Sequence, residues 1–384
     1  MTPAIHWLGA GLSSTPGILR LEAGPCPPIV WARTLAKARH TLSELNADID
    51  IRRLDWRQLR ESIAPGDVLV SMLPATKHLE VAELCLQQGA HFVSSSYLSP
   101  EMSGLHERAE SLRLCLVNEV GLDPGIDHLL AHSLVDQYQR SEHFSPRNQH
   151  FFRSYCGGFP KTPNEFRYKF SWSPLGVLRA LKSPSKWIAG GEIKTSRAPW
   201  HALTTFTARF PGGDEEFEAF ANRDSLPFLR QYGFGEDWDV REFVRGTLRL
   251  AGWSTAWRAI FDELDQLAED AAEQRMVELS RELEEKYSYH PGEPDRVALC
   301  VELEVHRDQQ VVWHRSCQLD SHGNAQGQAM ARLVSWPVSF AVDSILRGEL
   351  PAGVSAAPDN PQRVTQWLAH LESLGETISR REGT

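Results

Sequence analysis

The chain has 384 residues, 41% of them hydrophobic, and a formal net charge of −10 at pH 7. This length predicts two domains, because a single hydrophobic core stops growing at roughly 250–300 residues. The acidic balance argues against general nucleic-acid binding, and no apolar run approaches the roughly 18 residues that span a membrane.

The N-terminus and the cysteines indicate where the protein works. No basic region precedes the first apolar run, so we expect no signal peptide and a cytoplasmic location. The cysteines form no CxxC pair and no cluster with histidine, which predicts reduced thiols and no bound metal. They are Cys26, Cys85, Cys115, Cys156, Cys300 and Cys317.

Short apolar runs alternate with helical patterns over the first 121 residues. Strands are predicted at residues 4–8, 28–31, 49–54, 67–72, 91–94 and 115–118. Helices are predicted at 35–45, at 79–88 with Gly89 as the C-cap, and at 105–112. This rhythm predicts an α/β fold, a Rossmann domain with a doubly wound parallel sheet over residues 1–121.

The composition changes near Leu122, and residues 122–324 are expected to form an α+β substrate-binding domain. A helical insertion is predicted at about 224–290, with an antiparallel hairpin at 296–319. A helix at 325–345, interrupted at Pro337, should lead a segment (325–384) that packs back on the first domain. An apolar stripe in the insertion either covers its own domain or forms a homodimer surface. Its members are Leu264, Leu267, Ala271, Leu279 and Leu283.

A glycine motif follows the first predicted strand. Gly9 suits a tight turn, and Gly11 lets the backbone approach a pyrophosphate at a helix N-terminus. Ser14 stands where a third glycine is usual, and it is small enough for near-normal helix packing. The alternative is an ordinary glycine-rich turn without a ligand.

The end of the second predicted strand favours NADP over NAD. NAD-binding domains place a carboxylate near this position, about 20 residues after the glycines. Here the sequence is Trp31-Ala-Arg33-Thr34, and Arg33 and Thr34, helped by Lys37, suit a 2′-phosphate. The alternative is that these residues are solvated surface groups.

Seven strings then occur in a characteristic order. They are SMLP (71–74), SSY (95–97), NEVGLDPGIDH (118–128), YCGG (155–158), YKFSWSP (168–174), NRDS (222–225) and GTLR (246–249). Together they resemble saccharopine dehydrogenases of the NADP-dependent, L-glutamate-forming type. The resemblance extends over nearly the whole chain.

This resemblance implies an oxidoreductase of lysine metabolism that acts on a small amino-acid substrate. Glutamate and α-aminoadipate semialdehyde condense to an imine, which NADPH reduces to saccharopine, or the reverse oxidation occurs. Carried over by position, the saccharopine contacts are Ser96, Tyr97, Asp123, Arg223, Gly246, Thr247 and Leu248. The cofactor contacts are Gly9, Ala10, Gly11, Leu12, Arg33, Thr34, Ser71, Met72 and Leu73. Two residues depart from the family pattern. The family usually has alanine or glycine at the position of Ser14, and tyrosine at the position of Ala75.

Three residues are candidates for the chemistry. Asp123, whose carboxylate is fixed by the rigid DPG turn, suits a substrate ammonium, although it could instead cap the following helix. Lys169, inside an aromatic run, suits proton transfer during imine formation but could equally pair with a carboxylate. His78 could face the nicotinamide, or it could be structural. Arg223 is predicted to grip a substrate carboxylate, with support from Arg249.

Two other functions remain open. One is a related imine-reducing dehydrogenase, similar to carboxynorspermidine dehydrogenase, that joins an amino acid to an amine or aldehyde. A polyamine substrate requires acidic residues in the pocket, whereas Arg223 and Arg249 favour saccharopine. The other is a sensor that binds NADPH without turnover. No nucleic-acid or membrane partner is expected.

Overall fold

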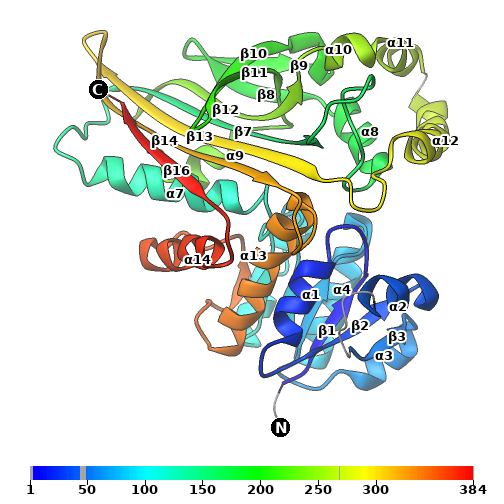
Figure 1. The fold of residues 1–384 in the computed structure, drawn as a ribbon. Coiled ribbons are helices and arrows are strands. Elements are labelled where there is room, and N and C mark those ends of the chain that lie inside the picture. Colours follow the sequence, from blue (N-terminus) through cyan, green and yellow to red (C-terminus); the bar gives the residue numbers. More distant parts are fainter. Residues whose placement is uncertain (1–2, 44–48, 268, 384) are drawn as a thin grey trace. The chain divides into compact units, whose positions relative to one another are not determined.

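Two compact units make up the computed structural model, which describes residues 3–43, 49–267 and 269–383 (Figure 1). The first unit comprises Met1–Leu129, Ala325–Gly327 and Ala331–Leu371. The second comprises Leu130–Asn324, Gln328–Met330 and Glu372–Thr384.

The first unit contains a seven-stranded parallel sheet in the order β15-β6-β5-β4-β1-β2-β3. Its strands are β1 (Ile5–Leu8), β2 (Pro28–Ala32), β3 (Ile51–Arg53), β4 (Val68–Ser71), β5 (His91–Val93), β6 (Cys115–Val117) and β15 (Gly353–Ser355). This order confirms the predicted doubly wound sheet. The edge strand β15 was not predicted.

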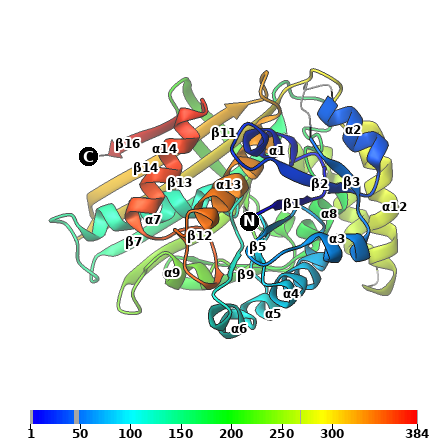
Figure 2. The same ribbon diagram turned by 90° about the horizontal axis from the view of Figure 1, so that it is seen from below.

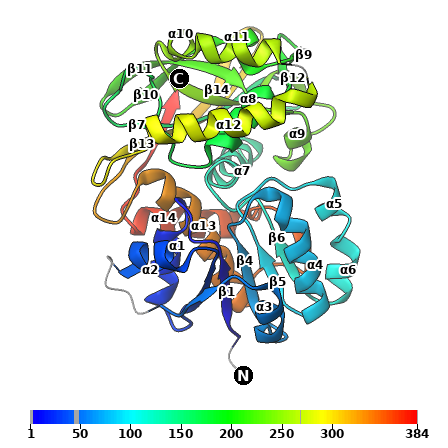
Figure 3. The same cartoon turned by 90° about the vertical axis from the view of Figure 1, so that its right-hand side faces the viewer.

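Helices cover both faces of this sheet. They are α1 (Thr15–Glu22), α2 (Leu35–Ser43), α3 (Trp56–Ser62), α4 (His78–Gln88), α5 (Pro100–Ser103), α6 (His106–Ser111), α13 (Ala329–Leu346) and α14 (Pro361–Ser373), with η1 (Ala75–Lys77) and the start of α7 (Ile126–Gln139). Leu8 packs with apolar residues of α3 to α6, helices that lie on one side of the sheet (Figure 3). On the opposite side α1 and α13 lie side by side (Figures 1 and 2). Gly89 ends α4 with φ +72°, as predicted, whereas the predicted end of α2 at residue 45 lies outside the described residues.

Helix α13 differs from its prediction in two ways. It continues through Pro337 without interruption, because burial of neighbours such as Val338 and Phe340 outweighs the lost hydrogen bond. By length and composition it is also the one helix, among the described residues, that could cross a membrane, which was not predicted from the sequence. Since 78% of the helix is buried inside the structure, it has the character of a core helix.

The second unit is built on a mixed sheet of nine strands (Figure 1). They are β7 (Gln149–Pro160), β8 (Ser185–Ala189), β9 (Glu192–Ser196), β10 (Thr204–Phe210), β11 (Gly213–Ala221), β12 (Asp239–Leu250), β13 (Asp295–Arg307), β14 (Gln310–His322) and β16 (Ile378–Gly383). The predicted hairpin is confirmed as β13 and β14, whose turn residues Asp308 and Gln309 have φ of +50° and +64°. Strands β7 and β12 are parallel, and the other pairs are antiparallel.

The predicted helical insertion at 224–290 is wrong in its first half. Residues 239–250 form β12, because small or apolar residues recur at every second position from Val244 to Leu250 and the strand is paired on both sides, with β11 and β7. Within this segment only the short helix α9 (Pro227–Gln231) precedes the strand, and the continuous helical part follows it as α10 (Trp253–Ala256), α11 (Arg258–Gln266) and α12 (Glu269–Tyr287) (Figure 3). The unit's other helices are α8 (Pro174–Lys182) and η2 (Pro199–Ala202).

The apolar stripe of the insertion covers its own unit. Leu264, Leu279 and Leu283 are buried in one cluster with Trp253 and Trp257, and Leu267 packs against it partly buried. The Ala271 side chain lies outside the described part. The stripe is therefore core, and it supplies no argument for a dimer.

Candidate functional site

The predicted cofactor and substrate residues of the first unit follow the carboxyl ends of its parallel strands. Gly9–Leu12 follow β1, Arg33 and Thr34 follow β2, and Ser71–Leu73 end and follow β4. Ser96 and Tyr97 come after β5, and Asp123 comes after β6. Ligands of doubly wound sheets bind at this edge, where the strand order reverses between β1 and β4.

The glycine turn after β1 has the geometry of a phosphate-binding loop. Gly9 has φ +99° and donates its N–H to Trp31 O at 2.8 Å. A side chain there would place Cβ 3.0 Å from Met72 O, whereas a Cβ on Gly11 would meet nothing within 4 Å. The backbone of Gly11 is thus open to a bound pyrophosphate, and the residues present fit a dinucleotide.

Close packing of the first helix depends on a glycine that the motif did not include. A Cβ on Gly17 would lie 2.4 Å from Ser335 O and 2.8 Å from the Trp7 ring. Ser14, at the usual third position, is the buried N-cap residue of α1. Gly17 therefore takes the packing role one turn later, and this glycine inside the first helix was the available signal.

Arg33 and Thr34 are exposed beyond the end of β2. Lys37 is exposed on α2. The segment from residue 31 to residue 37 has no carboxylate that would repel a phosphate. This surface suits a 2′-phosphate, in line with the predicted preference for NADP.

The carboxylate of Asp123 is held by Tyr97. The Asp123–Pro124 peptide bond is cis, and Tyr97 Oη donates to Asp123 Oδ1 at 2.8 Å. At the start of α7 the Gly125 N–H donates to Asp127 Oδ1 at 2.7 Å. The carboxylate that supports this helix start is thus Asp127, while Asp123 is engaged with Tyr97.

His78 is a buried histidine held between two serine hydroxyls. Its Nδ1 lies 2.9 Å from Ser71 Oγ and its Nε2 lies 2.8 Å from Ser96 Oγ. Burial lowers the pKa of His78 to about 4. A general acid or base works best with a pKa near the operating pH, and both ring nitrogens already contact serine hydroxyls. A structural role for His78 is therefore favoured over a catalytic one. The predicted catalytic role remains a prediction without support here.

His78 also makes stability depend on pH. Its pKa is about 4 in the folded protein, against 6.5 for an unperturbed histidine, so the unfolded chain takes up the proton first as the pH falls. The free energy of unfolding should therefore fall between pH 6.5 and 4, by roughly 3 kcal/mol from this residue. We expect the melting temperature of His78→Gln to depend less steeply on pH than that of the wild type. As a control, His143→Gln, at a half-exposed histidine, should keep the wild-type dependence of melting temperature on pH. If His78→Gln also keeps the wild-type dependence, the assignment of this effect to His78 is wrong.

The second unit carries the other predicted substrate residues. Gly246 and Thr247 of β12 lie opposite Tyr155 and Cys156 of β7, and Leu248 follows them. A Cβ on Gly246 would lie 2.3 Å from the Tyr155 ring, so only glycine lets that ring cover the strand. Arg223, with φ +55°, is exposed at the turn after β11.

Arg249 does not lie at the surface as a second clamp would. It is 7% exposed, and its guanidinium lies 5.0, 5.5 and 5.4 Å from the ring centroids of Tyr168, Phe220 and Trp253. Burial lowers the pKa of Arg249. The side chain ties the YKFSW segment to β12 through these rings.

Lys169 pairs with a carboxylate, which was the alternative to a role in proton transfer. Its Nζ lies 2.6 Å from a carboxylate oxygen of Glu293, and its side chain is 12% exposed. The ring of Tyr289 is 5.9 Å away. A role in proton transfer remains a prediction.

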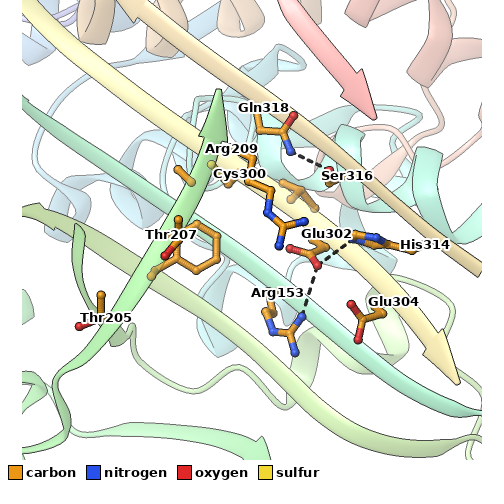
Figure 4. A pocket seen from close by; sticks show the side chains of 13 residues that line it. Arg153, Thr205, Thr207, Arg209, Cys300, Glu302, Glu304, His314, Ser316 and Gln318 are labelled. Carbon is orange, nitrogen blue, oxygen red and sulfur yellow. Dashed lines mark hydrogen bonds and ion pairs between the residues drawn. The ribbon is translucent and has the colours of Figure 1, made fainter. Parts of the chain in front are cut away.

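A separate polar cavity of about 250 Å³ lies on the sheet of the second unit (Figure 4). Glu302, Glu304 and His314 line it, with ligand atoms within 4.8 Å of one another. Glu302 already pairs with His314 at 2.9 Å and with Arg153 at 3.4 Å. Burial raises the pKa of Glu302, but His314 and Arg153 outweigh it and keep this pKa low. Arg153 also pairs with Glu242 at 2.5 Å, and Glu304 lies 2.6 Å from His306. The cluster is therefore part of an ion-pair network, and we assign no metal to it.

Two family models together match most of the chain. The model described as the saccharopine dehydrogenase NADP binding domain matches residues 5–116, and that of the saccharopine dehydrogenase C-terminal domain matches residues 121–376.

Curated relatives agree with this match. Saccharopine dehydrogenase [NADP(+), L-glutamate-forming] of Saccharomyces cerevisiae is 34% identical over 69% of this chain and 59% of its own length. Its counterpart in Pyricularia oryzae is 32% identical over 68% of this chain and 57% of its own. The mitochondrial alpha-aminoadipic semialdehyde synthase of Bos taurus is 26% identical over 83% of this chain and 41% of its own. The chain thus spans between about two fifths and three fifths of these relatives' length.

Solved structures show the same fold. The apo saccharopine dehydrogenase (L-Glu forming) of Saccharomyces cerevisiae superposes with a TM-score of 0.79 at 25% identity, and each chain is covered to 100%. A homospermidine synthase of Legionella pneumophila gives a TM-score of 0.63 at 10% identity over 100% of this chain and 92% of its own, which shows a shared fold alone.

Proposed function

Because this chain belongs to the saccharopine dehydrogenase family, we propose that it interconverts saccharopine with glutamate and α-aminoadipate semialdehyde as an NADP-dependent oxidoreductase. The observation that carries this proposal is the Tyr97–Asp123 pair at the carboxyl edge of the parallel sheet. These two residues stand at the positions that the family pattern assigns to saccharopine.

The proposed reaction needs little covalent chemistry from the protein. Bound NADP supplies the hydride acceptor for the oxidation of the saccharopine C–H bond next to the amine, and water then splits the resulting imine into glutamate and the aldehyde. The chain must orient the substrate and hold its charges. We assign the substrate ammonium to Asp123, whose carboxylate Tyr97 orients, and a substrate carboxylate to Arg223.

The same proposal covers the cofactor and the setting. Arg33 and Thr34 hold the 2′-phosphate, and the Gly9–Leu12 turn holds the pyrophosphate. The substrate is a small amino acid, and a cytoplasmic setting suits such a metabolic enzyme. We do not assign an oligomeric state.

The first test is turnover of saccharopine by Arg223→Ala. With NADP in excess, we expect kcat/KM for saccharopine to fall roughly 10- to 100-fold, because a hydrogen bond to a charged group contributes about 1.5–3 kcal/mol. Absorbance at 340 nm follows the reduced cofactor. Arg230→Ala, an exposed arginine on the nearby helix α9, serves as the matched control and should leave kcat/KM unchanged.

The outcomes separate the candidate functions. Turnover that depends on Arg223 supports saccharopine as the substrate. Turnover only with a polyamine-derived pair moves the assignment to the imine-reducing dehydrogenases that act on amines. If the protein binds NADPH but turns over neither substrate, the remaining candidate function is that of an NADPH sensor.

A further inference from the structure

A buried group of ionisable side chains lies behind the turn that carries Asp123. Glu119, Asp127 and His128 are 4%, 0% and 0% exposed. His128 lies between the two carboxylates, with Nε2 3.1 Å from Glu119 Oε2 and Nδ1 3.6 Å from Asp127 Oδ2. The first contact has an ion-pair distance without the alignment of a hydrogen bond. Burial of ionisable groups costs free energy unless they are paired, so the arrangement calls for a physical reason.

The second oxygen of each carboxylate holds the backbone of a candidate substrate segment. Glu119 Oε1 accepts the N–H of Leu98 at 2.9 Å, and Leu98 directly follows Tyr97. Asp127 Oδ1 accepts the N–H of Gly125 at 2.7 Å, two residues after Asp123. The buried group therefore connects the two segments that supply the Tyr97 hydroxyl and the Asp123 carboxylate.

These contacts close into a ring. From Tyr97 it runs through Glu119, His128 and Asp127 to the Asp123 turn, and the 2.8 Å bond from Tyr97 Oη to Asp123 Oδ1 completes it. We propose that Glu119, His128 and Asp127 are positioning residues that hold Tyr97 and Asp123 in register for the substrate. This inference rests on the proposed function, because that function assigns Tyr97 and Asp123 to saccharopine.

The turn itself shows why such support is required. Among its backbone bonds are those from Gly121 N to Pro124 O at 2.9 Å and from Ile126 N to Gly121 O at 2.9 Å. Glu119 adopts φ +56°, a conformation that non-glycine residues rarely take. Charge-assisted hydrogen bonds are about twice as strong as neutral ones, and a misplacement of about 1 Å costs up to 100-fold in rate. The Glu119–Leu98 and Asp127–Gly125 hydrogen bonds, joined through His128, can therefore keep the Asp123 carboxylate within reach of Tyr97.

The test is a double-mutant cycle on His128 and Asp123. We expect His128→Gln to lower kcat for saccharopine roughly 10- to 100-fold with little change in KM, because it disturbs the placement of reacting groups. The Kd of NADPH, measured by fluorescence, should change less than about twofold, because His128 acts on substrate placement and not on the cofactor. In an Asp123→Ala background the same substitution should have almost no further effect, because His128 acts through Asp123. Glu119→Gln keeps an acceptor for Leu98 and should give a smaller loss in the same direction.

The control is a buried histidine of the second unit. His150 lies 3.1 Å from Tyr138 Oη and 3.2 Å from Asp239 O. We expect His150→Gln to lower the melting temperature without changing kcat for saccharopine. A His128→Gln variant that behaves in the same way overturns the proposal, and so does an equal loss in the Asp123→Ala background.

Crystal structures of the wild type and of His128→Gln test the ring independently of turnover. The proposal requires that the bond from Tyr97 Oη to Asp123 Oδ1 is present in the wild type and broken in the variant. If it survives in both, the proposal is wrong. If the wild type does not turn over saccharopine, the proposed function fails, while the two crystal structures still decide whether His128 holds the ring together.

Discussion

Replacing Gly125 by alanine should nearly abolish turnover of saccharopine. Gly125 has φ +146°, and a Cβ there would lie 2.0 Å from Gly121 O and 2.3 Å from Gly121 N. Both are backbone atoms of the same turn, so the turn must open and separate Asp123 from Tyr97. We expect kcat/KM to fall at least about 100-fold and the free energy of unfolding to fall by about 3 kcal/mol, from strain and steric overlap together.

The control for Gly125→Ala is a glycine that also has a positive φ, but at which an added Cβ would overlap no other atom. Gly66 has φ +89°, and a Cβ there would meet no heavy atom within 4 Å. Gly66→Ala should cost about 1–2 kcal/mol of stability through its backbone conformation alone and leave kcat/KM unchanged. Steady-state kinetics and thermal unfolding of both variants give the comparison. Equal effects of the two substitutions would show that strain, and not the shape of the Asp123 turn, limits activity.

Replacing Arg33 by aspartate should reverse the cofactor preference. The substitution removes a guanidinium that suits the 2′-phosphate and puts a like charge against that phosphate. We expect the Kd of NADPH to rise at least about 100-fold, as two or more charged hydrogen bonds of about 1.5–3 kcal/mol each are lost. The Kd of NADH should change little or improve, since the new carboxylate suits ribose hydroxyls.

Direct binding is the measurement for Arg33→Asp, because it does not depend on the substrate. Fluorescence titration with NADPH and NADH gives both constants. Arg39→Asp, which makes the same charge change at an exposed residue of the following helix, should leave them as in the wild type. An Arg33→Asp variant that still binds NADPH tightly would place the 2′-phosphate elsewhere.

Periodicity was sufficient to predict six of the seven strands of the parallel sheet. Its strands are short buried runs bounded by turns, so Pro28–Ala32 and Val68–Ser71 are visible in the sequence. The edge strand Gly353–Ser355 has three residues and forms by pairing with Cys115–Val117, far away in the chain. No local pattern marks such a strand. Helix α3 was missed because Leu59 is its one buried residue, although Asp55 caps it through two backbone N–H groups.

The candidate site was only partly predictable, for the same physical reason. Motif strings identified Tyr97 and Asp123 singly, but their hydrogen bond joins residues 26 positions apart. Glu119 and His128 stood inside the NEVGLDPGIDH string without an assigned role, because the sequence does not show that both are buried. The sequence allows Lys169 either proton transfer or an ion pair, and the ion pair is made with Glu293, a partner 124 residues away that no local pattern identifies.

The division of the chain between the two units has a consequence for biosynthesis. The parallel sheet gains its edge strand β15 and its covering helix α13 from residues 325–371, which leave the ribosome after nearly all of the second unit. Until then the Gly17 and Trp7 side of the nascent nucleotide-binding unit lacks Ser335 and the helix around it. Contacts so distant in sequence form slowly and leave apolar surface exposed in the meantime. A stop codon or a ribosomal stall anywhere before residue 325 should therefore yield a chain that needs chaperones.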